Sequence, residues 1–244
     1  MELNNVKAIV TGACGGIGQA VTCGILEGGG TVGAICRSCP EPQDQLLPLK
    51  CDVTKPDEVS EAFATFCDKH GPPNVLVNNA GVLLDGPIIS IGATGINKYP
   101  LDKWSQTLST NLTGVFLCAQ EFVSSQVKNN IKNSVIINIS SVARNGNAGQ
   151  CAYSSSKGAV ASLTKTLAKE LLPLKIRTVA IAPGLIDTPM AQLIPESYKK
   201  IMIKNSCAKR IGQPHEVFHA VQFCIENEFF SGKILELDGG VFIG

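Results

Sequence analysis

The sequence carries no excess of charge of either sign. Its 21 Lys and Arg residues balance 20 Asp and Glu residues, which leaves a formal net charge of +1 at pH 7. Nucleic acids and anionic membrane surfaces are bound through clusters of positive charge, so this balance argues against both as partners. We therefore expect no nucleic-acid partner and no membrane partner.

Long apolar runs are also absent. None approaches the roughly 20 residues that a helix needs to cross a bilayer. Residues 1–10 lead directly into a predicted strand and lack the basic segment, apolar segment and cleavage site of a secretory signal. The ten cysteines are scattered, mostly within apolar segments, as at Cys23, Cys118 and Cys224. This distribution is typical of free thiols in a reducing compartment, so we expect a cytoplasmic protein.

Predicted strands and helices alternate along the whole chain. Strands are predicted at 6–11, 31–36, 45–51, 74–78, 135–139, 176–182 and 232–238. This alternation predicts an α/β fold, a doubly wound parallel sheet of about seven strands with helices on both faces. Since α/β folds often exceed roughly 200 residues as one unit, we expect a single domain over 1–244. Its cofactor half would be about 1–130, and its catalytic and substrate half about 131–244.

A glycine-rich loop follows the first predicted strand and precedes an apolar helix at 20–27. Gly12, Gly16 and Gly18 are spaced G-x-x-x-G-x-G, which differs from the G-x-G-x-x-G of the general dinucleotide fingerprint. Glycine lets the backbone approach a diphosphate, and the helix N-terminus offers free N–H groups and a positive dipole end. The place of this loop, at the first strand–helix junction, predicts a dinucleotide site.

The second predicted strand ends at Cys36 without the acid that would hold the ribose 2′-hydroxyl of NAD. Arg37 and Ser38 follow instead, and a guanidinium is well shaped to pair with a 2′-phosphate. We therefore expect NADP(H) to be preferred over NAD(H). The alternative is that Arg37 is a surface arginine on a loop.

The chain is organised around the segment from Ser140 to Lys157. Ser140 follows the predicted strand at 135–139, at the end of a strand where open α/β sheets bind ligands. Tyr153 and Lys157 begin a predicted helix, and an i, i+4 pair shares one helix face. A nearby ammonium favours the phenolate, so we expect Lys157 to lower the pKa of Tyr153 from about 10. A phenol tuned in this way can pass a proton to or from an alcohol oxygen near neutral pH.

A long helix is predicted from Leu101 to about Val127, after an irregular segment that ends at Pro100. Asn111 lies inside this helix, although its amide competes there for backbone groups. We expect either a buried role for Asn111 or a local distortion of the helix. The alternative is an asparagine that the helix merely tolerates.

Together these motifs resemble the short-chain dehydrogenase/reductase family over essentially the whole chain. In the family's order and approximate spacing they are Thr11-Gly12-x-x-x-Gly16-Ile17-Gly18, Asp52-Val53, Asn78-Asn79-Ala80-Gly81, Asn111, Ser140, Tyr153-x-x-x-Lys157, Pro183-Gly184 and Thr188. The resemblance implies a Rossmann-like fold and an NAD(P)-dependent oxidoreductase in which the cofactor supplies the hydride. It also implies a homotetramer or homodimer formed through the two long helices.

The resemblance implies roles for single residues. Tyr153 would be the general acid for carbonyl reduction, and Ser140 would hydrogen-bond the substrate carbonyl oxygen. Lys157 would lower the pKa of the tyrosine and hold the nicotinamide ribose, while Asn111 would position a water that relays protons toward Lys157. The implied cofactor contacts are Gly12, Cys14, Gly16, Ile17, Gly18, Arg37, Ser38, Asp52, Val53, Asn79, Ala80, Gly81, Tyr153, Lys157, Pro183, Gly184, Ile186 and Thr188.

Within the family, the segments 111–118, 146–150 and Asp85-Gly86 are most similar to 3-oxoacyl thioester reductases of the fatty-acid type. The resemblance therefore implies an NADPH-dependent ketoreductase of fatty-acid or polyketide synthesis, whose substrate is carried by acyl carrier protein or coenzyme A. The segment 91–99 looks like an insertion near the substrate side. Steroids, sugars and small alcohols therefore remain alternative substrates. Acyl length, carrier, product stereochemistry and pathway are left open.

One motif points to a different chemistry. His215-Glu216-x-x-His219 matches the H-E-x-x-H of zinc proteases, in which two imidazoles share a helix face. A third ligand is needed, and the only other histidine, His70, is far away in the sequence. We therefore expect no metal, with a zinc protease as a remote alternative.

Cys36 and Cys39 form a C-x-x-C pair beside a predicted βαβ unit. Such a pair can be a redox motif, although two reduced thiols are the simpler interpretation. A disulfide here would shift Arg37 and weaken NADP(H) binding. A further alternative is a non-catalytic NADP(H) sensor, but sensors of this fold usually lack the tyrosine or the lysine, and both are present here.

Overall fold

A single sheet of seven parallel strands forms the centre of the computed structural model, which describes residues 1–39, 41–92 and 95–241. The strands are β1 Lys7–Thr11, β2 Thr31–Cys36, β3 Leu46–Lys50, β4 Val75–Asn78, β7 Ser134–Ile139, β8 Ile176–Pro183 and β9 Ile234–Leu237. Their order across the sheet is β3-β2-β1-β4-β7-β8-β9. The predicted doubly wound α/β fold and its seven strands are confirmed.

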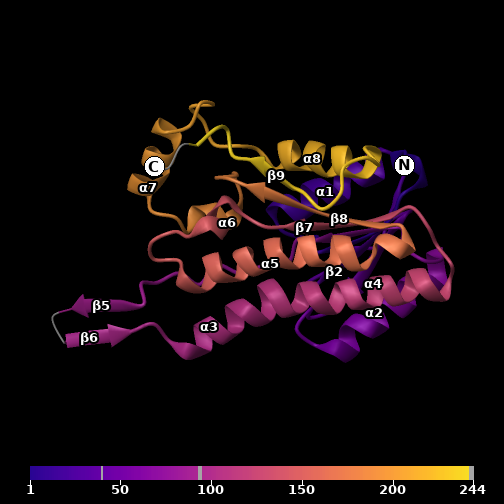
Figure 1. Cartoon of the computed structure of the whole chain (residues 1–244), viewed down its shortest axis with the longest axis horizontal. Coiled ribbons are helices and arrows are strands. Elements are labelled where there is room, and N and C mark those ends of the chain that lie inside the picture. Colours follow the sequence, from indigo (N-terminus) through magenta and orange to yellow (C-terminus); the bar gives the residue numbers. More distant parts are fainter. Residues whose placement is uncertain (40, 93–94, 242–244) are drawn as a thin grey trace.

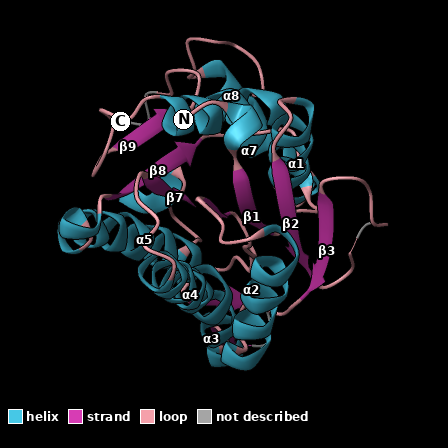
Figure 2. Ribbon diagram, turned by 90° about the vertical axis from the view of Figure 1, so that its right-hand side faces the viewer, coloured by secondary structure: helices cyan, strands magenta, loops and turns pink. Residues whose placement is uncertain are grey.

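The central strands are mostly apolar because helices cover both faces of the sheet (Figure 2). One face carries α1 Gly16–Glu27 and α8 Pro214–Glu226, and the other carries α2 Pro56–His70, α4 Gly114–Lys128 and α5 Cys151–Glu170. Side chains alternate along β1, so Val10 packs into the first core and Ile9 into the second. No helix among the described residues is long and apolar enough to cross a membrane.

The sheet order reverses between β1 and β4. The chain runs outward from β1 to β2 and β3, then returns to β4 and continues on the other side. In open α/β sheets, this reversal opens a crevice at the carboxyl ends of the strands, where ligands bind. The described residues therefore place a crevice directly beyond the glycine-rich loop that follows β1.

The helix predicted at 101–127 is interrupted. It consists of α3 Leu101–Leu108, a π-helical turn at Ser109–Thr113, and α4. The Val82 N–H donates to Asn111 Oδ1 at 2.8 Å, and Asn111 Nδ2 donates to the Val82 carbonyl at 3.0 Å. The wider turn directs this fully buried amide out of the helix and into the crevice wall. The buried role and the local distortion both occur.

The segment before Pro100, predicted to be irregular, contains a β-hairpin. Strands β5 Ile89–Gly92 and β6 Gly95–Lys98 pair in antiparallel fashion, and every residue in them is exposed. Figure 1 shows this ribbon projecting from the body beside the start of α3. The prediction of an irregular segment was wrong. Isoleucine favours strand, and here the strands pair with each other outside the central sheet. Residues 93–94 lie outside the described part.

Two short helices follow β8, α6 Pro189–Gln192 and α7 Glu196–Lys204. Single 3-10 turns occur at Leu3–Asn5, Val142–Asn145 and Leu172–Leu174. Met190 and Ala191 of α6 and Tyr198 and Met202 of α7 line a cavity at this end of the sheet.

Candidate active site

A cleft of about 730 Å³ opens at the carboxyl ends of β1, β2 and β4. The predicted cofactor residues that line it are Gly12, Cys14, Gly16, Ile17, Arg37, Ser38, Asp52, Val53, Asn79, Ala80, Gly81 and Thr188. An adjoining cavity of about 150 Å³ is lined by Ser140, Tyr153, Lys157, Pro183, Gly184 and Ile186, and shares Ile17, Asn79, Gly81 and Thr188 with the cleft. Residues from both halves of the chain thus meet at one edge of the sheet.

The glycine loop is packed tightly against the segment after β4. A Cβ on Gly12, whose φ is +64°, would lie 2.9 Å from the Ala80 Cα. A Cβ on Gly18 would lie 2.1 Å from the Gly12 carbonyl oxygen and 2.6 Å from Asn79 Nδ2. Gly18 therefore lies behind the loop rather than on the cleft, where it was predicted. The N-cap residue of α1 is Gly15, which has no side chain to accept hydrogen bonds from the first N–H groups of the helix.

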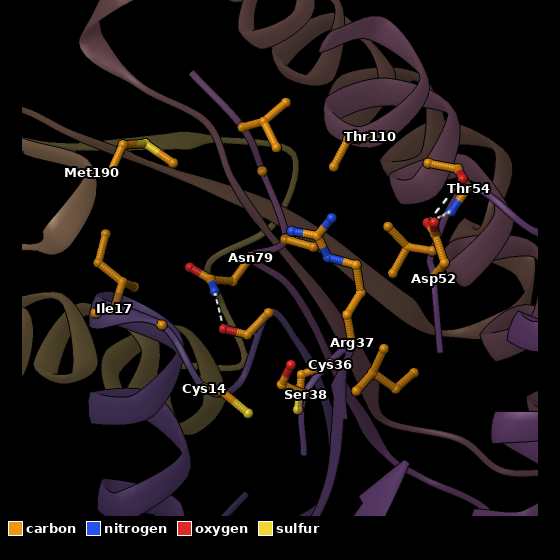
Figure 3. Close-up of a pocket in the computed structure, with 18 of the residues that line it drawn as sticks. Cys14, Ile17, Cys36, Arg37, Ser38, Asp52, Thr54, Asn79, Thr110 and Met190 are labelled. Atoms are coloured by element: carbon orange, nitrogen blue, oxygen red, sulfur yellow. Dashed lines mark hydrogen bonds between the residues drawn. The ribbon is translucent and has the colours of Figure 1, made fainter. Parts of the chain in front are cut away.

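Arg37 extends into the cleft between the glycine loop and Asp52 (Figure 3). Asp52 Oδ1 accepts hydrogen bonds from the Thr54 N–H at 2.9 Å and the Thr54 hydroxyl at 2.8 Å. The bond from the Thr54 N–H is the largest cause that holds the pKa of Asp52 below its usual range, and nearby Arg37 adds to the effect. Within the described residues Arg37 itself forms no ion pair closer than 4.0 Å.

Helix α5 places Tyr153 in its first turn and Lys157 one turn later. The Lys157 Nζ lies 5.7 Å from the centre of the Tyr153 ring and donates to the Ile139 carbonyl at 2.8 Å. Burial lowers the pKa of Lys157 to about 8. Burial also raises the pKa of Tyr153 to about 12, against an opposing hydrogen bond with the Ser141 hydroxyl. The pKa of Tyr153 is therefore raised and not lowered as expected, and desolvation of the phenol is the main cause.

The serine that meets Tyr153 is Ser141 rather than the predicted Ser140. Ser140 is only 2% exposed, and its hydroxyl donates to the Lys157 carbonyl at 3.0 Å. Side chains alternate along an extended chain, so Ser140 faces the same side as Asn138, two residues earlier. Asn138 faces α5, where its Nδ2 donates to Thr164 Oγ1 at 2.9 Å. Sequence order alone does not distinguish Ser140 from Ser141, because it leaves open which side of the extended chain each serine faces.

Asn111 joins the crevice wall to α5. Its Nδ2 also donates to the Ser156 hydroxyl at 3.1 Å, and Ser156 donates to the Tyr153 carbonyl at 2.7 Å. A Cβ on Gly81 would lie 3.3 Å from Asn111 Oδ1 and 3.6 Å from Lys157 Nζ, so this glycine lies close to both side chains. The side chain of Asn111 is thus committed to holding the first turn of α5 in place.

A chain of side-chain hydrogen bonds that the sequence did not predict crosses the second cavity. The Tyr198 hydroxyl on α7 donates to Asn147 Oδ1 at 2.9 Å, and Asn147 Nδ2 donates to Gln150 Oε1 at 2.8 Å. Gln150 Nε2 then donates to Asp85 Oδ2 at 2.6 Å. Tyr198, Asn147 and Gln150 line the cavity, and Ile194 and Met202 add apolar surface. The segment 146–150 was similar to 3-oxoacyl thioester reductases, but no local pattern in the sequence marked Tyr198.

The H-E-x-x-H motif lies at the start of helix α8, where Glu216 forms a capping box with Gln213, the N-cap residue. Glu216 accepts from the Gln213 N–H at 2.7 Å and from Arg210 Nη2 at 2.6 Å. Arg210 and this backbone bond lower the pKa of Glu216 to about 2. Across residues 1–39, 41–92 and 95–241, no group of three His, Cys, Asp or Glu side chains is placed to hold a metal. The carboxylate that a zinc protease would use as a base is occupied here by capping and ion pairing.

Comparisons with known proteins agree with this geometry. A family model described as short chain dehydrogenase matches residues 6–199. The chain is 35% identical over 259 residues to 3-oxoacyl-[acyl-carrier-protein] reductase FabG of Thermotoga maritima, with 100% of both chains covered. It is 34% identical to 3-hydroxyacyl-CoA dehydrogenase type-2 of Homo sapiens, covering 98% of this chain and 96% of that protein. A short-chain type dehydrogenase/reductase from Mycobacterium marinum superposes with a TM-score of 0.85 at 28% identity, covering 98% and 96% of the two chains.

Proposed function

We propose a reaction for this chain on one premise: the chain belongs to the short-chain dehydrogenase family. It is an NAD(P)-dependent oxidoreductase that acts on CH–OH groups. Our proposal is that it reduces the 3-oxo group of an acyl thioester with NADPH. The observation that supports this most is the cavity holding Tyr153, Ser141 and Lys157, which opens directly into the cleft of the glycine loop.

In this proposal the residues of the second cavity handle the proton. The bound nicotinamide supplies the hydride. Tyr153 donates its phenolic proton to the oxygen of the substrate carbonyl as that oxygen gains charge. Ser141 Oγ accepts from the Ala143 N–H at 3.1 Å, which orients the serine so that its own O–H can reach the same oxygen. The Ser140 hydroxyl is already committed to the Lys157 carbonyl.

Lys157 stabilises the phenolate that remains after proton donation and supplies the replacement proton. Its pKa of about 8 makes it charged below that pH and neutral above it. We therefore expect the rate of ketone reduction to be constant at neutral pH and to fall as pH rises through about 8. The measurement is kcat for thioester reduction from neutral to alkaline pH.

Lys157→Arg is the control for this pH profile, because a guanidinium stays charged to above about pH 12. The variant should be slower, since Arg does not match the lysine geometry, but its alkaline fall should disappear. A flat wild-type profile, or the same fall in the variant, would contradict the role of Lys157.

The cofactor side of the proposal places Arg37 against the 2′-phosphate of NADPH, while the glycine loop and the start of α1 hold the diphosphate. Asp52 is the one acid that lines the cleft among the described residues, and its carboxylate is engaged by Thr54. Asn79 and Gly81, shared by both cavities, would lie along the path from the adenosine to the nicotinamide. Pro183, Gly184 and Ile186 would face the nicotinamide amide.

Arg37→Ala should weaken NADPH binding roughly tenfold to a hundredfold, the loss of charge-assisted hydrogen bonds to a phosphate. NADH affinity should stay within about twofold, since NADH carries no 2′-phosphate. Titration of each cofactor by its fluorescence measures both constants. Lys55→Ala is the control, because Lys55 is an exposed cation next to the cleft that does not line it. Equal losses for both cofactors, or for both variants, would contradict the NADP(H) preference.

The relatives support a thioester substrate. One is named a 3-oxoacyl-[acyl-carrier-protein] reductase and another a 3-hydroxyacyl-CoA dehydrogenase, so the second candidate is oxidation of a 3-hydroxyacyl-CoA with NAD+. The lack of an acid after β2 favours NADPH-dependent reduction of a 3-oxoacyl thioester.

The test compares acetoacetyl thioesters with NADPH, 3-hydroxybutyryl-CoA with NAD+, and plain ketones and steroids. Fast turnover only of the plain ketones would discard the thioester and keep the site.

We also propose that the protein is a homotetramer or homodimer formed through α4 and α5. Phe116 and Val127 of α4 are 48% and 57% exposed, which is apolar surface suited to contact with a second copy. The substrate would be presented on acyl carrier protein or on coenzyme A.

A further inference from the structure

Three thiols lie together at the base of Arg37. Cys36 is the last residue of β2, Cys39 follows three positions later, and Cys14 belongs to the glycine loop. The Cys36 and Cys39 sulfurs are 3.7 Å apart, and the Cys14 thiol hydrogen-bonds Cys36. Figure 3 shows Cys14 and Cys36 beside Ser38, below the Arg37 side chain. All three cysteines are free.

We propose that Cys36 and Cys39 are a thiol modification site: peroxides oxidise them to a disulfide, which moves Arg37 and lowers the affinity for NADPH. This inference rests on the proposed contact between Arg37 and the 2′-phosphate.

The geometry selects this pair. Cys39 Sγ donates to the Cys36 carbonyl at 3.3 Å, so its side chain already folds back toward the end of β2. A disulfide holds its sulfurs about 2.05 Å apart, so the two must approach by less than about 2 Å. The ring closed by this bond contains only Arg37 and Ser38 between the two cysteines. Both of those residues line the cofactor cleft.

The oxidation balances with a peroxide as oxidant. The Cys39 thiolate is the attacking group, because Cys39 is partly exposed whereas Cys36 is buried with its thiol pKa raised, chiefly by burial. Attack on hydrogen peroxide breaks the O–O bond and gives a sulfenic acid and one water. The Cys36 sulfur then displaces the sulfenic oxygen as a second water and forms the S–S bond. Two electrons pass from the thiols to the peroxide, and dithiothreitol reverses the change.

The expected consequence is selective for NADPH. Closing the ring pulls the ends of the Arg37–Ser38 segment together and turns its backbone, which removes the guanidinium from the 2′-phosphate position. The glycine loop, its Asn79 hydrogen bonds at 3.1 Å and the start of α1 lie outside the ring. These elements would hold the parts of the cofactor that NADH and NADPH share, so NADH affinity should change little.

The experiment treats the full-length protein with hydrogen peroxide, removes the oxidant and confirms a Cys36–Cys39 bond by peptide mass spectrometry. We expect the Kd for NADPH to rise roughly tenfold or more, as expected for losing charge-assisted contacts, and the Kd for NADH to stay within about twofold. Dithiothreitol should restore both. Cys39→Ser should keep its NADPH affinity after peroxide, and Cys14→Ser should show the same fold-change on oxidation as the wild type.

Three results would overturn the inference: no Cys36–Cys39 bond, a bond with unchanged NADPH affinity, or an equal peroxide effect in Cys39→Ser. The last would assign the effect to another thiol, and the result for Cys14→Ser would show whether that thiol is Cys14. A reduced protein that binds NADPH no better than NADH would instead contradict the assignment of Arg37, and this is measured before any oxidant is added.

Discussion

The Tyr153→Phe variant should lose roughly 10²- to 10⁴-fold in kcat, the range for removal of a general acid, while its cofactor affinity stays within about twofold. Phenylalanine keeps the ring that packs in the first turn of α5 and removes only the hydroxyl. Because burial raises the pKa of Tyr153 to about 12, the phenol is protonated at neutral pH and available as a donor. Single-turnover reduction of an acetoacetyl thioester measures the chemical step.

Tyr198→Phe is the matched control for this variant. Tyr198 lines the same cavity, but its hydroxyl donates to Asn147 rather than reaching the Ser141 side of the site. It should therefore keep kcat within about tenfold, with the larger change in KM because α7 loses a contact over the substrate. If Tyr153→Phe turned over at close to the wild-type rate, or if Tyr198→Phe fell as far, Tyr153 would not be the acid.

Ser141→Ala should lower kcat/KM by roughly 10²- to 10³-fold, because it removes a hydrogen-bond donor at the position where the carbonyl oxygen gains charge. Ser140→Ala, one residue away, should keep kcat/KM within a few-fold. Its cost should appear in stability instead, about 1 kcal/mol for one buried hydrogen bond to the Lys157 carbonyl. Steady-state kinetics and urea unfolding of the two variants separate these effects. The opposite ranking in kcat/KM would return the catalytic role to Ser140.

The fold was predictable because its signals are local. Largely apolar runs such as 135–139 mark strands covered on both faces, and the glycine loop marks the first strand–helix junction. A buried role for Asn111 could also be predicted, because the side-chain amide of an asparagine inside a helix needs a hydrogen-bond partner. The sequence could not identify that partner, the backbone of Val82, because it is brought near only by the crossing of β4 and α4.

The errors arose where the outcome depends on register or on tertiary packing. The resemblance assigns the serine that binds the substrate carbonyl to Ser140, whereas the contacts of the two side chains lead us to propose Ser141 for this role. The segment that forms β5 and β6 has isoleucines that are exposed, and its sequence pattern is typical of neither a buried strand nor an ordinary loop. The pKa of Tyr153 follows from its burial, and the place of Tyr198 follows from how α7 folds over the cavity. Neither can be derived from spacing.

Transfer of deuterium from NADPH labelled at the nicotinamide C4 to an acetoacetyl thioester is the most direct test of the proposed reaction. The label must be on the face of the ring from which hydride leaves, so both diastereomers are used. We expect one of them to give 3-hydroxybutyryl thioester with a single deuterium at C3, at a rate that falls with Tyr153→Phe. NADPH consumption in which neither diastereomer delivers deuterium to C3 of the product, or no 3-hydroxy product from a protein that binds NADPH tightly, would contradict the proposal.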